Sequence, residues 1–327
     1  MVVLKKPWLL VSAEAAHRWA PCLLPIVARW PSSIDPKWRS LEWRGLHFRN
    51  RLGLAGGVDK DAVNVEDWWK LGVGFIEIGT VTPVEQKSNP GKVVARNLKL
   101  RALWNKLGFP SEGAEKVLRR LNELRKPYRT PLFVNVGKNR TTPNEEAVED
   151  YLDVIGTFED AADAFVINLS SPNTVGLRDL LKPESLQPLL SELRLKTKKP
   201  CLLKLSPDTE DGDLLIAIDT AIHSGMNGFI LTNTTLERSP EMTFSHEGGV
   251  SGQPLAPRSK SVLQKVVSQL GPRRKDFLVI SVGGVMSPED VEERLQLGAD
   301  LVQIYTALIF EGPLFFRHVA RKIGGAR

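Results

Sequence analysis

Between residues 41 and 327, short runs rich in Val, Ile and Leu alternate with longer, more polar segments of helical pattern. Eight apolar runs predict strands, at 52–55, 75–79, 132–136, 164–168, 201–205, 228–232, 278–281 and 301–304. A predicted helix follows each of them, at 63–71, 114–124, 145–158, 183–197, 211–223, 257–270, 288–297 and 314–323. Eight strand-then-helix units in a row are typical of an α/β fold built on a parallel sheet.

The predicted strands are apolar along their whole length, whereas a half-exposed strand would alternate apolar and polar residues. Strands of this kind are usually parallel and covered on both faces. We therefore expect a (β/α)8 TIM barrel, preceded by a small hairpin at 42–50. A doubly wound open sheet is the alternative, but no Gly-x-Gly-x-x-Gly follows the first strand, which argues against its dinucleotide-binding form.

The pattern of the first 40 residues predicts a helical arm, so we divide the chain into an arm at 1–40 and a barrel at 41–327. Two short helices are expected between residues 8 and 30. Ser12 is a suitable N-cap for the first helix and Pro21 ends it, while Pro25 falls in the first turn of the second.

This end of the chain is also basic and rich in tryptophan. Residues 1–51 contain nine basic and three acidic residues, which account for the whole net charge of +6. A nucleic-acid-binding domain would carry such an excess as a patch on its main fold, so we expect no nucleic-acid partner. Indole rings beside cations suit a membrane surface, and an arm simply packed on the barrel is the alternative. The tryptophans are Trp8, Trp19, Trp30, Trp38 and Trp43.

Cysteine usage and hydropathy indicate the cellular compartment in which the protein folds and whether the chain crosses a membrane. Cys22 and Cys201 lie far apart in apolar surroundings, which predicts a reducing compartment and no metal site. No apolar run approaches the roughly 20 residues that span a bilayer. The apolar stretch near the start is interrupted by Glu14, His17 and Arg18, so we do not expect an export signal.

In a TIM barrel the chemistry lies in the loops at the carboxyl ends of the strands. Polar residues and glycines occupy these positions after all eight predicted strands. They include Gly56-Gly57, Asp59-Lys60, Thr80, Asn135, Asn168, Lys204, Thr232-Asn233-Thr234, Gly283-Gly284 and Tyr305-Thr306. We therefore expect one site that draws on the whole rim of the barrel.

Two groups of residues in these loops suggest what the site binds. The glycines at 248–252 and 283–284 expose backbone N–H groups near the last two strands, where barrels often bind phosphate. Tight turns are the alternative reading of these glycines. Amide side chains can both donate and accept, and so can hold a ligand with carbonyl, amide and carboxylate groups. The amides on this rim are Asn105, Asn135, Asn168, Asn173 and Asn233.

The segment 168–174, Asn-Leu-Ser-Ser-Pro-Asn-Thr, follows a buried strand directly. Small hydroxyl and amide side chains replace apolar ones there, and Pro172 prevents the strand from continuing. This is the pattern of a reactive loop, although an ordinary turn uses the same residue types.

Together these motifs closely resemble the dihydroorotate dehydrogenase family, in the same order and over nearly the whole chain. The segments that carry the resemblance are 59–60, 79–83, 105–109, 135–139, 168–174, 232–235, 248–252 and 303–306. The chain is most similar to the class 2, quinone-reducing form, because Ser171 stands where the soluble class has a cysteine and because the arm stands where class 2 enzymes carry a helical lid.

The resemblance implies FMN as cofactor, dihydroorotate and orotate as substrate and product, and a membrane quinone as final electron acceptor. It further implies a peripheral protein on the cytoplasmic face of a bacterial inner membrane. A relative that uses fumarate or NAD is one alternative, against which Ser171 argues, and a flavin-binding barrel without turnover is another.

The resemblance also assigns roles to residues. Ser171 would be the catalytic base, with Thr174 a candidate to orient its proton relay. Substrate binding would fall to Lys60, Asn105, Lys106, Leu107, Gly108, Phe109, Asn168, Asn173, Asn233 and Thr234. FMN would be held by Gly56, Gly57, Thr80, Asn135, Asn168, Lys204, Thr232, Gly252, Gly284, Tyr305 and Thr306. The chain departs from the family pattern at Pro110-Ser111, where two asparagines are usual, and at Val175, where proline is common.

Overall fold

The computed structural model describes residues 6–124, 126, 128–174 and 176–325. Residues 1–5 of the predicted arm and Val175 therefore lie outside the described residues. Eight parallel strands form a closed barrel in the order β10-β12-β13-β3-β4-β7-β8-β9, which confirms the TIM barrel and excludes the open sheet. The strands are β3 (Leu52–Asp59), β4 (Ile76–Val81), β7 (Leu132–Val136), β8 (Ala164–Asn168), β9 (Cys201–Leu205), β10 (Gly228–Leu231), β12 (Leu278–Val282) and β13 (Leu301–Ile304).

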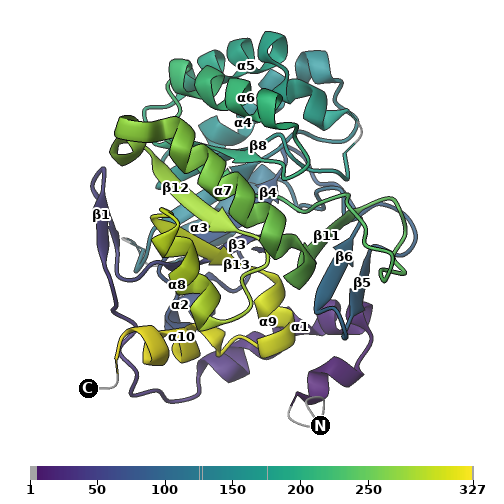
Figure 1. Cartoon of the computed structure of the whole chain (residues 1–327), viewed down its shortest axis with the longest axis vertical. Coiled ribbons are helices and arrows are strands. Elements are labelled where there is room, and N and C mark those ends of the chain that lie inside the picture. Colours follow the sequence, from purple (N-terminus) through teal and green to yellow (C-terminus); the bar gives the residue numbers. More distant parts are fainter. Residues whose placement is uncertain (1–5, 125, 127, 175, 326–327) are drawn as a thin grey trace.

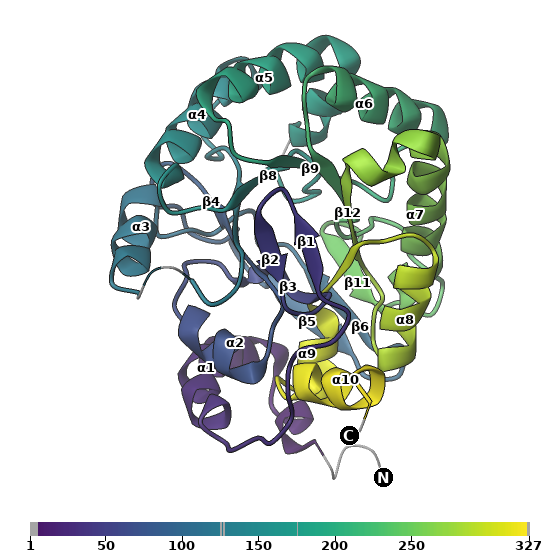
Figure 2. The ribbon, with the colours of Figure 1, turned by 90° about the vertical axis from the view of Figure 1, so that its left-hand side faces the viewer.

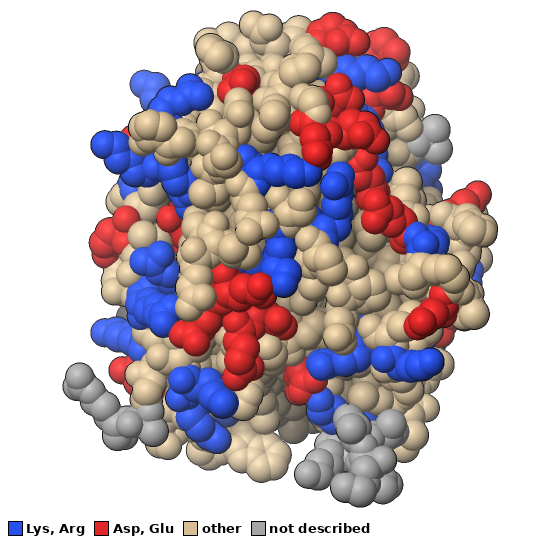
Figure 3. Space-filling view, viewed as in Figure 1, with Lys and Arg blue, Asp and Glu red and all other residues tan. Residues whose placement is uncertain are grey.

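Helices pack around the outside of the barrel because their apolar faces bury against the strands (Figure 1). They are α2 (Val65–Leu71), α3 (Ala114–Asn122), α4 (Ala147–Phe158), α5 (Pro183–Lys196), α6 (Asp211–His223), α7 (Ala256–Leu270), α8 (Pro288–Gln296), α9 (Thr306–Glu311) and α10 (Phe315–Ile323). The short helix α9 was not predicted from the sequence. On the face drawn in Figure 3, basic and acidic side chains are interspersed.

The hairpin predicted before the barrel is present, and it closes one end of the barrel. Its strands, β1 (Leu41–Trp43) and β2 (Leu46–Phe48), lie across the barrel in Figure 2. Phe48 is fully buried, and its ring meets those of Phe75 and Phe133 edge to face at 5.8 and 6.2 Å. The amino-terminal end of the barrel is therefore filled by side chains.

A three-stranded antiparallel sheet beside the barrel was missed by the sequence analysis. It consists of β5 (Val94–Asn97), β6 (Ala102–Asn105) and β11 (Gly249–Gly252), in the order β11-β6-β5. The pairing of β6 with β11 places Asn105 opposite Gly249 and so carries residues distant in the sequence to the same side of the barrel mouth.

Within residues 6–40, the described part of the arm, one α-helix, α1 (Ala13–Ala28), follows a short 3-10 turn at Pro7–Leu10, so the prediction of two helices between residues 8 and 30 was wrong. Ser12 caps it as expected, its Oγ accepting from the N–H of Ala15 at 3.2 Å. Pro25 has no N–H for the carbonyl oxygen of Pro21, but Asn64 Nδ2 donates to that oxygen at 3.1 Å. Among the described residues, no helix is both long and apolar enough to cross a membrane.

Candidate active site

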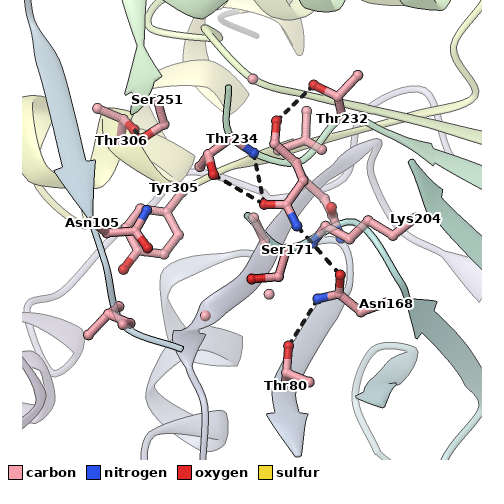
Figure 4. Close-up of a pocket in the computed structure, with 18 of the residues that line it drawn as sticks. Thr80, Asn105, Asn168, Ser171, Lys204, Thr232, Thr234, Ser251, Tyr305 and Thr306 are labelled. Carbon is pink, nitrogen blue, oxygen red and sulfur yellow. Dashed lines mark hydrogen bonds between the residues drawn. The ribbon is translucent and has the colours of Figure 1, made fainter. Parts of the chain in front are cut away.

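A pocket opens at the carboxyl ends of the barrel strands (Figure 4). Two charged side chains, Lys60 and Lys204, are present among its described lining residues, and no carboxylate is. Amides and hydroxyls make up most of the remaining polar lining. A cavity with this composition suits a ligand that carries negative charge together with ring carbonyl and N–H groups.

Most residues predicted for the site meet in this pocket, although they come from every part of the barrel. They are Gly56, Gly57, Lys60, Thr80, Asn105, Leu107, Gly108, Phe109, Asn135, Asn168, Ser171, Asn173, Lys204, Thr232, Asn233, Thr234, Gly284, Tyr305 and Thr306. The closed barrel explains the convergence, because it brings the ends of all eight strands to one rim.

Lys106 and Gly252 are not among the lining residues. Lys106 directs its ammonium away, into an ion pair with the carboxylate of Glu247. Gly252 pairs with Ala102, and a Cβ there would lie 2.2 Å from the carbonyl oxygen of Arg101. The neighbouring Ser251 does line the pocket, and its Oγ is 2.8 Å from Thr306 Oγ1. The segment 248–252 predicted to lie at the site therefore reaches the pocket through Ser251.

Ser171 lies in the loop after β8 and is 4% exposed. Its Oγ accepts a hydrogen bond from the backbone N–H of Asn173 at 3.2 Å, which fixes the hydroxyl in the pocket. Figure 4 shows it between Asn105 of β6 and Lys204 of β9. Thr174 is buried but is not one of the lining residues, so the structure does not place it against the ligand.

A hydrogen-bond network joins the amides at the ends of neighbouring strands. Asn168 Nδ2 donates to Thr80 Oγ1 at 3.0 Å and to Asn135 Oδ1 at 3.1 Å. Asn233 Nδ2 donates to Ser170 Oγ at 3.1 Å. Such a network holds each amide in one orientation, so its remaining donors and acceptors are pre-positioned for a ligand.

Lys60 directly follows β3, and its Nζ donates to the carbonyl oxygen of Gly57 at 2.8 Å. Desolvation lowers the pKa of its ammonium below the ordinary value, while the carboxylates of Asp61 and Asp59 oppose this effect. Asp59 is buried and accepts from the N–H groups of Val63 and Asn64. Burial nevertheless raises the pKa of Asp59 to about 6.

Near the last strands the backbone forms a narrow cradle. Gly283 and Gly284 have φ of 108° and 74°, and a Cβ on Gly284 would lie 2.4 Å from Cα of Ala256, where α7 begins. Arg294 holds this cradle in place, because its Nη2 donates to Gly283 O and to Ser259 Oγ, both at 2.9 Å. Burial lowers the pKa of Arg294 to about 10.

Arg294 and Glu77 were missed by the sequence analysis. Glu77 is an isolated acidic residue inside the predicted strand at 75–79, and that isolation was the available signal. Arg294 lies in the predicted helix at 288–297, and both side chains are buried. Pro110-Ser111, the departure from the family pattern, sits at the rim: Pro110 lines the pocket and Ser111 pairs with Gln86 through two backbone hydrogen bonds.

Comparison with known proteins identifies the family. The family model described as dihydroorotate dehydrogenase matches residues 40–326. A dihydroorotate dehydrogenase (quinone) of Thermus thermophilus is 44% identical over 300 residues, which is 91% of this chain and 85% of that protein. Its counterpart from Mycolicibacterium smegmatis is 38% identical over 337 residues, or 99% of this chain and 94% of that protein.

The fold agrees with this match. The crystal structure of ligand-free DHODH from Eimeria tenella has a TM-score of 0.85 and 30% sequence identity, and the alignment covers 94% of this chain and 92% of that one. With its barrel, its pocket and its sequence all in agreement, the chain belongs to the dihydroorotate dehydrogenase family.

Proposed function

We propose that this chain oxidises (S)-dihydroorotate to orotate in pyrimidine biosynthesis and delivers the two electrons through FMN to a membrane quinone. Family membership supports the oxidation, and relatives bearing the name dihydroorotate dehydrogenase (quinone) support the acceptor. The observation that carries the proposal is the position of Ser171, a buried hydroxyl in a pocket that is also lined by Lys60 and by amide side chains. These amides are Asn105, Asn135, Asn168, Asn173, Asn233 and Gln303.

The family implies a flavin, and the pocket fits FMN. The glycine cradle at Gly283-Gly284, next to the first turn of α7, offers N–H groups and a helix N-terminus to a phosphate. Thr306 and Ser251 place hydroxyls at the same end. We assign the flavin ring to the side lined by Gly56, Gly57, Thr80, Asn135, Asn168, Lys204, Thr232 and Tyr305, with Gly284 and Thr306 at the phosphate.

FMN, when bound, would accept the hydride and pass the two electrons on to the quinone. Ser171 Oγ takes the proton from the carbon beside the ring carbonyl and passes its own hydroxyl proton to a relay that leads to solvent. The neighbouring carbon gives up its hydride, so that one C=C bond forms. Serine is a weak base at its ordinary acidity, so its activity depends on positioning. The hydrogen bond from Asn173 N–H to Ser171 Oγ supplies that positioning and stabilises the hydroxyl oxygen as its proton leaves.

Substrate recognition follows from the chemistry of the remaining groups. The Lys60 ammonium suits the substrate carboxylate. Asn105, Asn173 and Asn233 can pair with the ring's carbonyl and N–H groups, because an amide supplies both partners. Thr234 lies beside Asn233, whose Oδ1 accepts from its N–H at 2.8 Å, and Leu107, Gly108 and Phe109 close the pocket from the opposite loop.

The arm at 1–40 is proposed to dock the barrel on a membrane surface and to lead the quinone to the flavin. Trp19, Leu23, Ile26 and Trp30 follow one another at intervals of four, three and four residues and are 52–69% exposed. This spacing puts Trp19, Leu23 and Ile26 on one face of α1, while Leu24 and Ala28 are buried on the other, and Trp30 follows just beyond the end of the helix. An exposed apolar stripe on an amphipathic helix is the form of an interfacial anchor.

The arm is fixed to the barrel by specific contacts. Arg96 Nη2, on β5, donates to the carbonyl oxygen of Leu9 at 2.8 Å, and Trp8 Nε1 donates to Ile309 O at 3.0 Å. The stripe is therefore presented in a defined orientation relative to the pocket.

Steady-state assays with different electron acceptors test the proposal. With dihydroorotate as donor, we expect turnover with a ubiquinone analogue and little or none with fumarate or NAD. Faster turnover with fumarate or NAD would contradict the quinone assignment. Protein that binds FMN yet forms no orotate with any acceptor would contradict the enzymatic one.

A further inference from the structure

Glu77 gathers three pocket side chains around one buried carboxylate. It lies on β4 and is fully buried. Lys204 Nζ is 2.8 Å from Oε1, Asn135 Nδ2 donates to the same oxygen at 2.5 Å, and Gln303 Nε2 donates to Oε2 at 2.6 Å. These partners come from β9, β7 and β13, and all three line the pocket.

The neighbouring strand makes room for this carboxylate. A Cβ on Gly56 would lie 2.2 Å from Glu77 Oε1 and 3.1 Å from Asn135 Nδ2. Any side chain at position 56 would therefore clash with the Glu77 carboxylate, so this position requires glycine whether or not it also contacts a cofactor. The strand end, the carboxylate and the amide form one packed layer directly behind the pocket wall.

The buried ion pair controls the charge that the pocket presents. Lys204 is 6% exposed, so water screens it little and its ammonium acts strongly on nearby groups. Glu77, at 2.8 Å, cancels much of that positive potential while holding the ammonium in place. A flavin gains negative charge on reduction, so the balance between the two residues sets how readily it is reduced.

We infer that Glu77 is a positioning residue that tunes the reduction potential of the cofactor by fixing Lys204 and compensating its charge. This inference rests on the proposed function, since it takes the flavin to lie against Lys204. It assigns no contact between Glu77 and the ligand.

The pair can be tested with an isosteric change. In Glu77→Gln the Lys204 ammonium keeps an oxygen acceptor but loses the compensating charge. Gln303 Oε1 has no hydrogen-bond partner within the described residues, so rotation of its amide lets it accept from the new side-chain NH2 group. The variant therefore keeps a donor–acceptor pair at the contact with Gln303 and avoids two opposed NH2 groups there.

The measurement is the reduction potential of bound FMN, obtained anaerobically by equilibration with a reference dye. We expect Glu77→Gln to shift the potential to more positive values than wild type, because positive charge beside the flavin is no longer compensated. The double variant Glu77→Gln/Lys204→Met removes both charges and is expected to return the potential toward wild type. Glu66→Gln, an exposed site on α2, is the matched control and leaves the potential unchanged.

A potential for Glu77→Gln equal to that of Glu66→Gln would overturn the inference, as would a double variant shifted as far as the single one. If the variants give either of these results while wild-type protein binds FMN and forms orotate, the proposed function stands and only the role of Glu77 is removed. Wild-type protein without bound flavin would overturn both.

Discussion

Asn173 Nδ2 donates a hydrogen bond to Asn105 Oδ1 at 2.9 Å, and this bond joins the loop after β8 to the end of β6. Within the described part of the chain, Asn173 Oδ1 is buried and has no hydrogen-bond partner. A buried acceptor without a partner is costly unless a ligand satisfies it. The bond to Asn105 thus fixes which end of the Asn173 amide faces the substrate.

Replacing Asn105 by alanine is expected to raise the KM for dihydroorotate by about 10- to 100-fold, because the Asn173 amide is then free to rotate and one substrate contact is lost. FMN content stays as in wild type. Initial-rate measurements across dihydroorotate concentrations provide the check. Asn122→Ala, at an exposed position at the end of α3, serves as control, and an unchanged KM for Asn105→Ala would speak against the substrate clamp.

Asp59 is expected to make stability depend on pH. Its folded-state pKa of about 6 lies above the ordinary 3.8, so its contribution is complete below pH 3.8 and is lost as the pH rises through about 6. Between pH 5 and pH 7 the wild type should lose about 1 kcal/mol relative to Asp59→Asn. Denaturant unfolding of both proteins at several pH values measures this difference. A constant difference across the range would show that Asp59 ionises normally.

The barrel could be predicted from sequence because each of its strands is a local apolar run. Strands β7, β8, β9 and β13 begin and end at the predicted residues. The sheet of β5, β6 and β11 could not be predicted in this way, because β11 pairs with β6 across more than a hundred residues and its sequence, Gly-Val-Ser-Gly, is indistinguishable from a turn.

The arm shows the same limit. Proline in a helix interior normally costs about 3 kcal/mol, which made two helices the better prediction. The compensating donor, Asn64 Nδ2, lies 43 residues away from Pro21 and could not be linked to it from the sequence. Likewise the residues that line the pocket were predictable as strand ends. The roles of the side chains behind them depend on tertiary contacts: Glu77 pairs with Lys204 on a distant strand, and Arg294 on α8 bonds to Gly283 in the loop after β12.

Loss of Arg294 is expected to weaken FMN binding. Arg294 remains protonated at neutral pH, with its pKa at about 10, and its bonds to Gly283 O and Ser259 Oγ hold the cradle proposed for the phosphate. We expect Arg294→Met to lose roughly 2 kcal/mol of stability and about tenfold in FMN affinity. Flavin fluorescence during dilution measures the affinity. Arg321→Met, exposed on α10, is the control, and equal FMN affinity in the two variants would rule out the bracing role.

The exposed stripe of α1 is expected to bind membranes. The double variant Leu23→Ser/Ile26→Ser should lower the affinity for anionic lipid vesicles by about tenfold, because two apolar side chains that would be buried in the membrane surface are replaced by polar ones. Turnover with a ubiquinone analogue in those vesicles should fall with it, while reduction of the flavin by dihydroorotate should not. Leu195→Ser, at a residue 89% exposed on α5, tests whether any exposed leucine has this effect. Unchanged vesicle binding in the double variant would make the arm structural only.

The central claim is that Ser171 removes a proton from dihydroorotate in this pocket. Its most direct test is anaerobic mixing of Ser171→Ala and wild-type protein with dihydroorotate while the flavin absorbance is followed. We predict that wild-type flavin bleaches and that the variant, with FMN still bound, bleaches about 100- to 10,000-fold more slowly. Bleaching of the variant at a rate close to that of wild type would contradict the account.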